Sequence, residues 1–168
     1  MKDTAAEKQL KKPSSISAIL HDIRSSHNVG SMFRTADALG VEKLFLTGYT
    51  PAPKDKFNRP NKEISKVALG GEMTVAWEFS EDVFDVIKKL KKAGVEIVAI
   101  EQSSKSVDYK DFSLSGPTTF IFGNEVDGVP EKILDLCDKI VSIPMKGKKE
   151  SLNVSVAFGI ALARITNA

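Results

Sequence analysis

The stretch TTFIFGNEVDGVP, residues 118–130, places a buried-strand pattern directly before a turn that carries two glycines. Its first part, TTFIF, is a continuous apolar run, typical of a parallel sheet that is covered on both faces. Gly123 and Gly128 then bracket the turn, where glycines let backbone N–H and C=O groups approach a flat ligand closely. An ordinary strand-to-helix turn over Asp127 and Gly128 explains them equally well. The stretch predicts an α/β fold with a candidate ligand-binding turn.

Strand and helix patterns alternate on both sides of this stretch. Apolar β-prone runs predict further strands at 16–23, 42–48, 74–79, 95–100 and 139–143. Helical spacing predicts helices at 29–39, 63–69, 81–93, 130–136 and 153–166. Asn28 and Ser80 have the character of N-caps and Gly40 and Gly94 that of helix ends, whereas 48–62 and 101–117 resemble loops. This order predicts one open, mostly parallel sheet with helices on both faces, and ligands bind such sheets beyond the carboxyl ends of strands.

The composition fits one globular domain, which we place at residues 16–168. The 168 residues are 42% hydrophobic and 27% charged. Residues 1–15 are polar, and we expect a mobile arm or a short frayed helix there, with no secretory signal. No apolar run approaches the roughly 18 to 20 residues of a membrane span. The single cysteine, Cys137, excludes an intrachain disulfide and fits a reducing cytoplasm.

The net charge of the chain is only +2, but positive charge gathers in two predicted loops. Any one of these lysines is explained equally well as a solvated loop charge. Two basic loops in one small domain nevertheless favour contact with a phosphate backbone. The candidate nucleic-acid contacts are Lys54, Lys56, Arg59, Lys62 and Lys148.

Several common catalytic signatures are missing from the sequence. There is no GxGxxG after the first predicted strand and no GxxxxGK[ST], so ordinary dinucleotide binding and P-loop chemistry are not indicated. There is also no GxSxG elbow and no pair of histidines at metal-binding spacing, which argues against a hydrolase or a metalloenzyme. We expect no metal ion.

The stretch HNVGSMFRTADALGV, residues 27–41, carries an arginine beside the apolar stripe of its predicted helix. Arg34 lies next to that stripe and not opposite it. Two roles fit this position. One is an ion pair on the helix surface, and the other is a place in a cleft where the planar guanidinium holds paired phosphate oxygens.

The stretch IPMKGKKESLNVS, residues 143–155, leaves a predicted strand and enters the last predicted helix. Ser151 and Asn153 lie at the mouth of that helix, where each side chain can cap the backbone or bind a ligand. The helix itself is apolar nearly all round. It must therefore be buried against the core, a partner chain, or both.

Together these three stretches resemble the motifs of the SpoU (TrmH-like) branch of the SPOUT RNA methyltransferases. The pattern Asn-x-Gly-x-x-x-Arg-Thr occurs at 28–35, Gly-x-Glu-x-x-Gly at 123–128, and Ile-Pro-Met followed by Ser-Leu-Asn-Val-Ser at 143–155. The motifs stand in the family's order. The resemblance covers about residues 16–166, essentially the whole predicted domain.

The resemblance implies a sheet whose C-terminal part is tied into a trefoil knot, with the segment 143–153 passing through it. True knots are rare, and periodicity gives no sign of one. The resemblance also implies S-adenosyl-L-methionine as the cofactor, held in a bent shape largely through backbone groups. The matching cofactor-binding positions are Phe122, Gly123, Ile143, Met145 and Leu152.

The family transfers a methyl group to a ribose 2′-OH of RNA, and the resemblance implies this reaction, on tRNA in preference to rRNA. Arg34 matches the family's catalytic arginine. Because a guanidinium is a poor base, its expected role is assisted deprotonation of the 2′-OH, together with an RNA phosphate or a polar neighbour. We expect Asn28 and Asn153 to orient Arg34 and the RNA. The residues that match the rest of the site are Asn28, Glu125, Ser151 and Asn153, with Glu125 holding the turn at 123–128.

Members of the family are generally homodimeric, with the active site near the partner's first helix, so we expect a homodimer. Longer relatives carry a separate N-terminal RNA-binding domain, whereas only about 15 residues precede the first predicted strand here. We therefore expect RNA to be recognised by the arm, the 51–67 loop and the dimer surface.

Two other functions remain open from the sequence. One is a catalytically silent RNA-binding protein on the same fold, which would be marked by loss of Arg34 or of the Ser-Leu-Asn motif at 151–153. The other is a small-ligand regulatory domain of flavodoxin-like topology, which would bind the cofactor without RNA-dependent turnover. Both motifs are present, which favours the methyltransferase.

Overall fold

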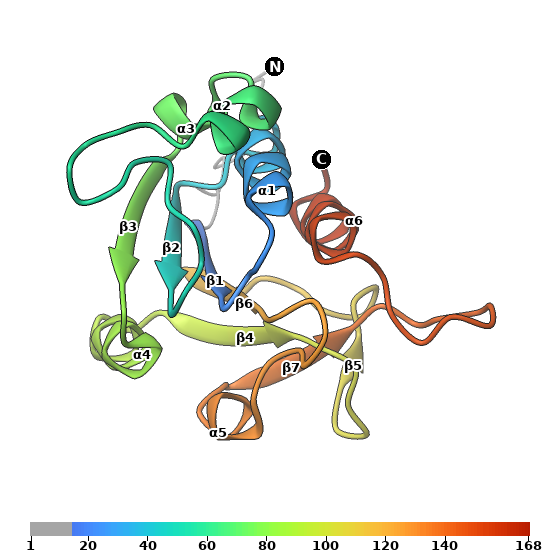
Figure 1. Cartoon of the computed structure of the whole chain (residues 1–168). Helices are drawn as coiled ribbons and strands as arrows, with labels where there is room; N and C mark the ends of the chain where they lie inside the picture. The colour runs from blue at the N-terminus through green and yellow to red at the C-terminus, as the bar shows by residue number, and fades with distance from the viewer. Residues whose placement is uncertain (1–14) are drawn as a thin grey trace, which may run out of the picture.

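The sheet is described by a computed structural model that covers residues 15–168, so the predicted arm at 1–15 lies outside the described residues except for Ser15. Residues 15–168 form one sheet of seven parallel strands in the order β3-β2-β1-β6-β4-β7-β5 (Figure 1). The order confirms the predicted α/β sheet. The strands are β1 (Ile16–His21), β2 (Lys43–Thr47), β3 (Ala76–Ser80), β4 (Glu96–Ile100), β5 (Val107–Asp108), β6 (Thr118–Phe122) and β7 (Lys139–Ser142).

Helices cover both faces of this sheet, as predicted. The helices are α1 (Ser26–Leu39), α2 (Lys62–Ala68), α3 (Gly71–Thr74), α4 (Val83–Lys92), α5 (Glu131–Leu134) and α6 (Val154–Thr166). The layer with α1, α2, α3 and α6 lies on one face, and α4 and α5 lie on the other (Figure 1). Within 15–168, no helix is long and apolar enough to cross a membrane.

Strand β6 lies at the centre of the fold, and its side chains alternate between two cores. Phe120 and Phe122 join the core beneath α1 and α6, where the ring centroids of Phe122 and Phe158 lie 4.9 Å apart. Ile121 points the other way, into the core with α4 and α5. All of β6 is buried, which confirms a strand covered on both faces. Burial of each large apolar side chain stabilises the fold by roughly 1.5–3 kcal/mol. The end of β6, where the next turn begins, is therefore held rigidly in the core.

Two predicted helix starts are wrong by two or three residues. In α1 the cap is Ser25, whose Oγ accepts the N–H of Asn28 at 3.2 Å. In α4 the cap is Asp82, not Ser80, and its carboxylate accepts the N–H of Phe84 at 2.7 Å. A cap must stand two or three residues before the N–H that it accepts, and these residues stand there. Asn28 is thus inside the first turn of α1, and its side chain is available for other contacts.

Short elements were not visible in the sequence pattern. The predicted loop at 101–117 contains β5, which pairs with β7, and α3 begins at Gly71, where only the end of a helix was expected. Elements of two and four residues are too short to show a period. Gly40 ends α1 in the left-handed conformation with φ 68°, as predicted.

Candidate functional site

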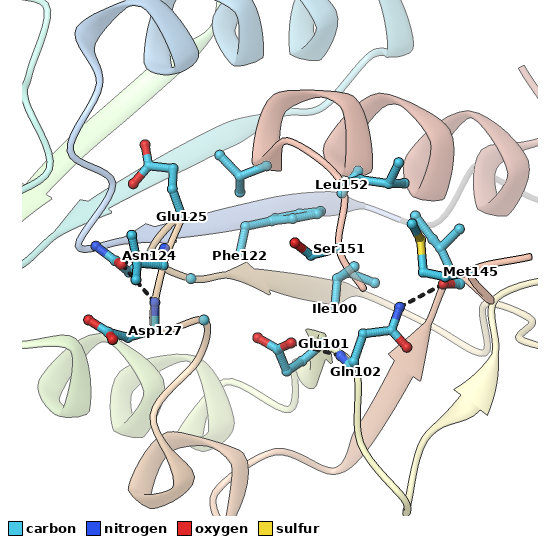
Figure 2. Close-up of a pocket in the computed structure, with 16 residues that line it drawn as sticks. Ile100, Glu101, Gln102, Phe122, Asn124, Glu125, Asp127, Met145, Ser151 and Leu152 are labelled. Carbon is cyan, nitrogen blue, oxygen red and sulfur yellow. Dashed lines mark hydrogen bonds between the residues drawn. The ribbon is translucent and has the colours of Figure 1, made fainter. Parts of the chain in front are cut away.

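A pocket of about 180 Å³ opens at the carboxyl ends of three neighbouring strands, β6, β4 and β7 (Figure 2). Phe122 ends β6 and residues 123–128 follow it, Ile100 ends β4 and residues 101–102 follow it, and Ile143 follows β7. The segment before α6 and the first turns of that helix close the remaining side. The pocket therefore lies where an open parallel sheet binds ligands.

All five residues predicted to bind the cofactor line this pocket. They are Phe122, Gly123, Ile143, Met145 and Leu152. Glu125 and Ser151, which were predicted as parts of the catalytic site, line it as well. The lining combines apolar side chains with the backbone of two turns, as expected for a site that binds a flat ring and hydrogen-bonds through main-chain groups.

The two glycines of the turn after β6 are required by the turn itself. A Cβ on Gly123 would overlap the backbone of Gly128. Asn124 and Gly128 exchange two backbone hydrogen bonds, of 3.1 and 2.9 Å, and Gly128 has φ 68°. Close approach of the chain to itself, and not only to a ligand, thus explains these glycines.

Asn124 holds the same turn from inside and ties it to two other loops. Its Oδ1 accepts the N–H groups of Val126 and Asp127 at 2.8 and 2.9 Å. Its Nδ2 donates to the backbone oxygen of Asp22 at 2.9 Å and to the hydroxyl of Tyr49 at 2.7 Å. All hydrogen-bonding positions of this buried amide are engaged, so the wall of the pocket is fixed before any ligand arrives.

The polar floor of the pocket was missed by the sequence reasoning. The Glu101 carboxylate accepts the N–H of Gln102 at 2.7 Å, and the Gln102 side chain donates to the Ile143 oxygen at 2.7 Å (Figure 2). The same carboxylate accepts the N–H of Val129 at 2.9 Å. These contacts join the ends of β4, β6 and β7. Polar residues directly follow the predicted strand 95–100, but no local pattern places them at a pocket.

A chain of hydrogen bonds joins the three sequence motifs beside the pocket. Asn153 Nδ2 donates to Asn28 Oδ1 at 3.2 Å, and Asn28 Nδ2 donates to Glu125 Oε1 at 3.0 Å. The Glu125 carboxylate also accepts the backbone N–H groups of Arg24 and Ser25 at 3.0 and 3.2 Å. The predicted partners Asn28, Glu125 and Asn153 are thus brought together, and the mouth of α1 is fixed against the turn after β6.

These hydrogen bonds affect the ionisation of Glu125. Burial alone would raise the pKa of its carboxyl group, but the hydrogen bonds from Arg24, Asn28 and Ser25 outweigh burial and lower the pKa below its ordinary value. Glu125 is therefore a carboxylate at neutral pH.

Asn153 has a second role, because its Oδ1 accepts the N–H of Ser155 at 2.9 Å and caps α6. One side chain thus caps α6 and also contacts Asn28.

Arg34 is not brought into the pocket. Its side chain is exposed and makes no hydrogen bond or ion pair with any residue in 15–168. A Cβ on Gly30 or Gly71 would meet α2 or the backbone of Arg34 itself, so this side of α1 packs against α2 and α3. Asn28 and Thr35 instead face α6. The expected contacts of Asn28 and Asn153 with Arg34 are absent among the described residues.

The predicted nucleic-acid contacts are all exposed at the surface. Four of them lie in or beside the β2–α2 segment, residues 48–61, and Lys148 lies in the β7–α6 segment, residues 143–153. Arg59 is paired with Asp55, whose Oδ2 lies 2.7 Å from the guanidinium. No cluster of His, Cys, Asp and Glu in the described chain could hold a metal ion.

A family model places this chain among known proteins. The model of the SpoU rRNA Methylase family matches residues 15–163. The chain belongs to the SpoU methylase family. The match contains all three motifs that meet around the pocket.

Two relatives of this SpoU-family chain have named activities. 23S rRNA (guanosine-2′-O-)-methyltransferase RlmB of Neisseria meningitidis serogroup B is 38% identical over 145 residues, which is 86% of this chain and 55% of the relative. The tRNA (guanosine(18)-2′-O)-methyltransferase of Aquifex aeolicus is 35% identical over 144 residues, which is 84% of this chain and 64% of the relative. The chain thus spans between about half and two thirds of the length of these relatives.

Solved structures of the SpoU family share this fold. The AdoMet-bound rRNA methyltransferase from Sinorhizobium meliloti has a TM-score of 0.82 at 28% identity, covering 91% of this chain and 56% of that one. The A. aeolicus TrmH/SpoU tRNA modifying enzyme has a TM-score of 0.80 at 30% identity, covering 94% of this chain and 76% of that one.

Proposed function

We propose that this chain is an S-adenosyl-L-methionine-dependent RNA methyltransferase that modifies a ribose 2′-OH. The observation that carries the proposal is the pocket, because residues from two separate motifs line it together, namely 122–128, Ile143, Met145, Ser151 and Leu152. The hydrogen bonds through Asn28 then attach the third motif. The named activities of the two relatives, both guanosine-2′-O-methyltransferases, support the same reaction.

The pocket fits the cofactor chemically. Phe122, Ile143, Met145 and Leu152 offer apolar contact for an adenine ring and for the carbon chain of the cofactor. Main-chain groups at Gly123 and along the two turns offer hydrogen bonds. The cofactor, when bound, supplies a sulfonium methyl group, which is a good electrophile.

Arg34 is the residue we assign to the 2′-OH. Its guanidinium would hold an RNA phosphate and assist loss of the hydroxyl proton to that phosphate or to a polar neighbour. The 2′ oxygen would then bond to the methyl carbon as the methyl–sulfur bond breaks and the sulfur leaves as a neutral thioether. Asn28, Glu125 and Asn153 fix the mouth of α1 against the cofactor turn, and Ser151 offers a hydroxyl inside the pocket.

A homodimer would complete this site. Arg34 lies outside the pocket of its own chain, so we infer that the Arg34 of a second copy approaches the cofactor. Helix α6 supports this arrangement, because it leaves Val156 and Ile160 47% and 39% exposed while its other face is buried. Exposed branched side chains in a row are typical of a surface that is covered by a partner.

Further features belong to the same proposal. We propose that the segment 143–153 and α6 form the trefoil knot of the SPOUT fold, and that the reaction takes place in the cytoplasm. The substrate is tRNA or rRNA. We favour tRNA, although the relatives that act on rRNA and on tRNA are almost equally similar to this chain.

Transfer of labelled methyl groups tests the proposal. The protein is incubated with labelled S-adenosyl-L-methionine and with unmodified tRNA or rRNA in separate reactions, and the RNA is digested to nucleosides. We expect label in a 2′-O-methylated nucleoside from one of the two RNA pools. Cofactor binding with no label in either pool would contradict the proposal and favour an RNA-binding protein without activity.

A further inference from the structure

The turn at residues 54–60 presents an exposed aromatic ring with two cations close to it. Phe57 is 66% exposed. The Lys56 ammonium lies 5.2 Å from the centroid of its ring, and the Arg59 guanidinium carbon lies 5.0 Å from it. A single exposed phenylalanine is ordinary on a protein surface, but one that carries two cations on its ring is a potential ligand platform.

The turn that carries Phe57 is held by one carboxylate. Asp55 Oδ1 accepts the N–H groups of Phe57 and Arg59 at 2.8 and 3.0 Å, and its Oδ2 accepts Arg59 Nε at 2.7 Å. The hydrogen bond from the Arg59 N–H leads the effects that lower the pKa of Asp55, so the carboxylate is charged at neutral pH. Lys56 has no carboxylate partner in 15–168 and is free to leave the ring.

The same turn is anchored next to the candidate active site. Asn61, the cap of α2, donates its Nδ2 to Ser26 Oγ at 3.2 Å at the start of α1. At the other end of the segment Tyr49, 58% exposed, accepts the hydrogen bond from Asn124 in the pocket wall. Figure 1 shows the segment between β2 and α2 projecting on the side of α2 and α3. Both of its ends are thus fixed to the motifs that surround the pocket.

An exposed ring with flanking cations selects one form of nucleic acid. Bases in a duplex are already stacked on each other and offer no free face, whereas an unpaired base can stack on an aromatic side chain while lysine or arginine contacts its phosphate. We propose that the turn at 54–60 binds an unpaired nucleotide of RNA, with the base stacked on Phe57 and with Lys56 leaving the ring to contact a neighbouring phosphate. This inference rests on the proposed function, and it makes the substrate a single-stranded or looped region.

Binding of short RNAs tests the platform. Fluorescence anisotropy would measure the affinity of the protein for a labelled single strand of about 12 nucleotides and for the same sequence in a duplex. We expect Phe57→Ala to weaken single-strand binding about tenfold and to leave duplex binding within about twofold. Phe57→Tyr keeps the ring and should keep the affinity. Phe84→Ala is the matched control, because Phe84 is 44% exposed on α4 and no cation lies over its ring among residues 15–168.

A second readout reports stacking directly. In Phe57→Trp, we expect the new indole fluorescence to be quenched by the single strand at the same concentration at which anisotropy rises. Wild-type affinity of Phe57→Ala for the single strand, or an equal loss for the duplex, would overturn the proposal. Methyl transfer is measured in parallel, so that Phe57-dependent binding without any transfer would reject the proposed function and keep this inference.

Discussion

The two halves of the candidate active site differ in how completely one chain builds them. On the cofactor side, Asn124 and Glu125 make every hydrogen bond within reach, and the wall of the pocket is fixed by three loops. On the other side, Arg34 stands exposed on α1 without a partner among the described residues. In the proposed function, this difference means that a single chain prepares the cofactor pocket, whereas Arg34 reaches the RNA and the cofactor only across a dimer.

Removal of the exposed Arg34 side chain should lower the activity more than any other change. We expect Arg34→Ala to lower the rate of methyl transfer about 10²- to 10⁴-fold, which is the usual contribution of a group that assists proton transfer. Cofactor affinity, measured by calorimetry, should stay unchanged because Arg34 does not line the pocket. A wild-type transfer rate in this variant would remove Arg34 from the mechanism.

Distortion of the turn after β6 should instead weaken binding of the cofactor. In Gly123→Ala the new Cβ overlaps the backbone of Gly128, and relief of such overpacking costs about 1–3 kcal/mol. We expect cofactor Kd to rise about 5- to 150-fold in calorimetry. Gly147→Ala is the matched control, since a Cβ there has no neighbour within 4 Å. Equal cofactor affinity in the two variants would show that the turn adapts freely.

The carboxylate that joins the motifs should matter for stability. Glu125→Ala leaves the N–H groups of Arg24 and Ser25 and the Asn28 amide without their acceptor. Because the site is only partly buried, we expect a loss of about 1–2 kcal/mol in the free energy of unfolding by urea. Glu81→Ala, at an exposed position before α4, should change it by less than about 0.5 kcal/mol. Similar losses in both variants would contradict a joining role for Glu125.

The smallest expected effect is on pH dependence. A carboxyl group whose pKa is lowered in the folded state contributes stability above its unfolded pKa of about 4.3, and that contribution is lost as the pH falls through the folded value. The stability difference between the wild type and Glu125→Gln should thus be constant above about pH 5 and shrink below about pH 4. A stability difference between these two proteins that persists at low pH would contradict a contribution from the negative charge of Glu125.

The same two halves show what the sequence could predict. The apolar run 118–122 has a pattern long enough to reveal a buried strand, whereas the five predicted cofactor positions came from the resemblance to the SpoU family and line the pocket. Glu101 and Gln102 were missed because the pairing of β4 between β6 and β7 is a tertiary fact that no local pattern records. Ser25 and Asn28 are both residue types that cap helices, and only the start of α1 in the structure assigns the cap to Ser25.

Complementation between two variants with different defects tests most directly whether the halves come from different chains. Arg34→Ala and Gly123→Ala proteins would be mixed, allowed to exchange subunits, and assayed for methyl transfer to RNA at a cofactor concentration far below the Kd of Gly123→Ala. If Arg34 acts across the dimer, half of the dimers are mixed and each has one complete site, so we expect roughly a quarter of the wild-type rate. A mixture no more active than the separate variants would contradict a shared site and place Arg34 in its own chain's reaction.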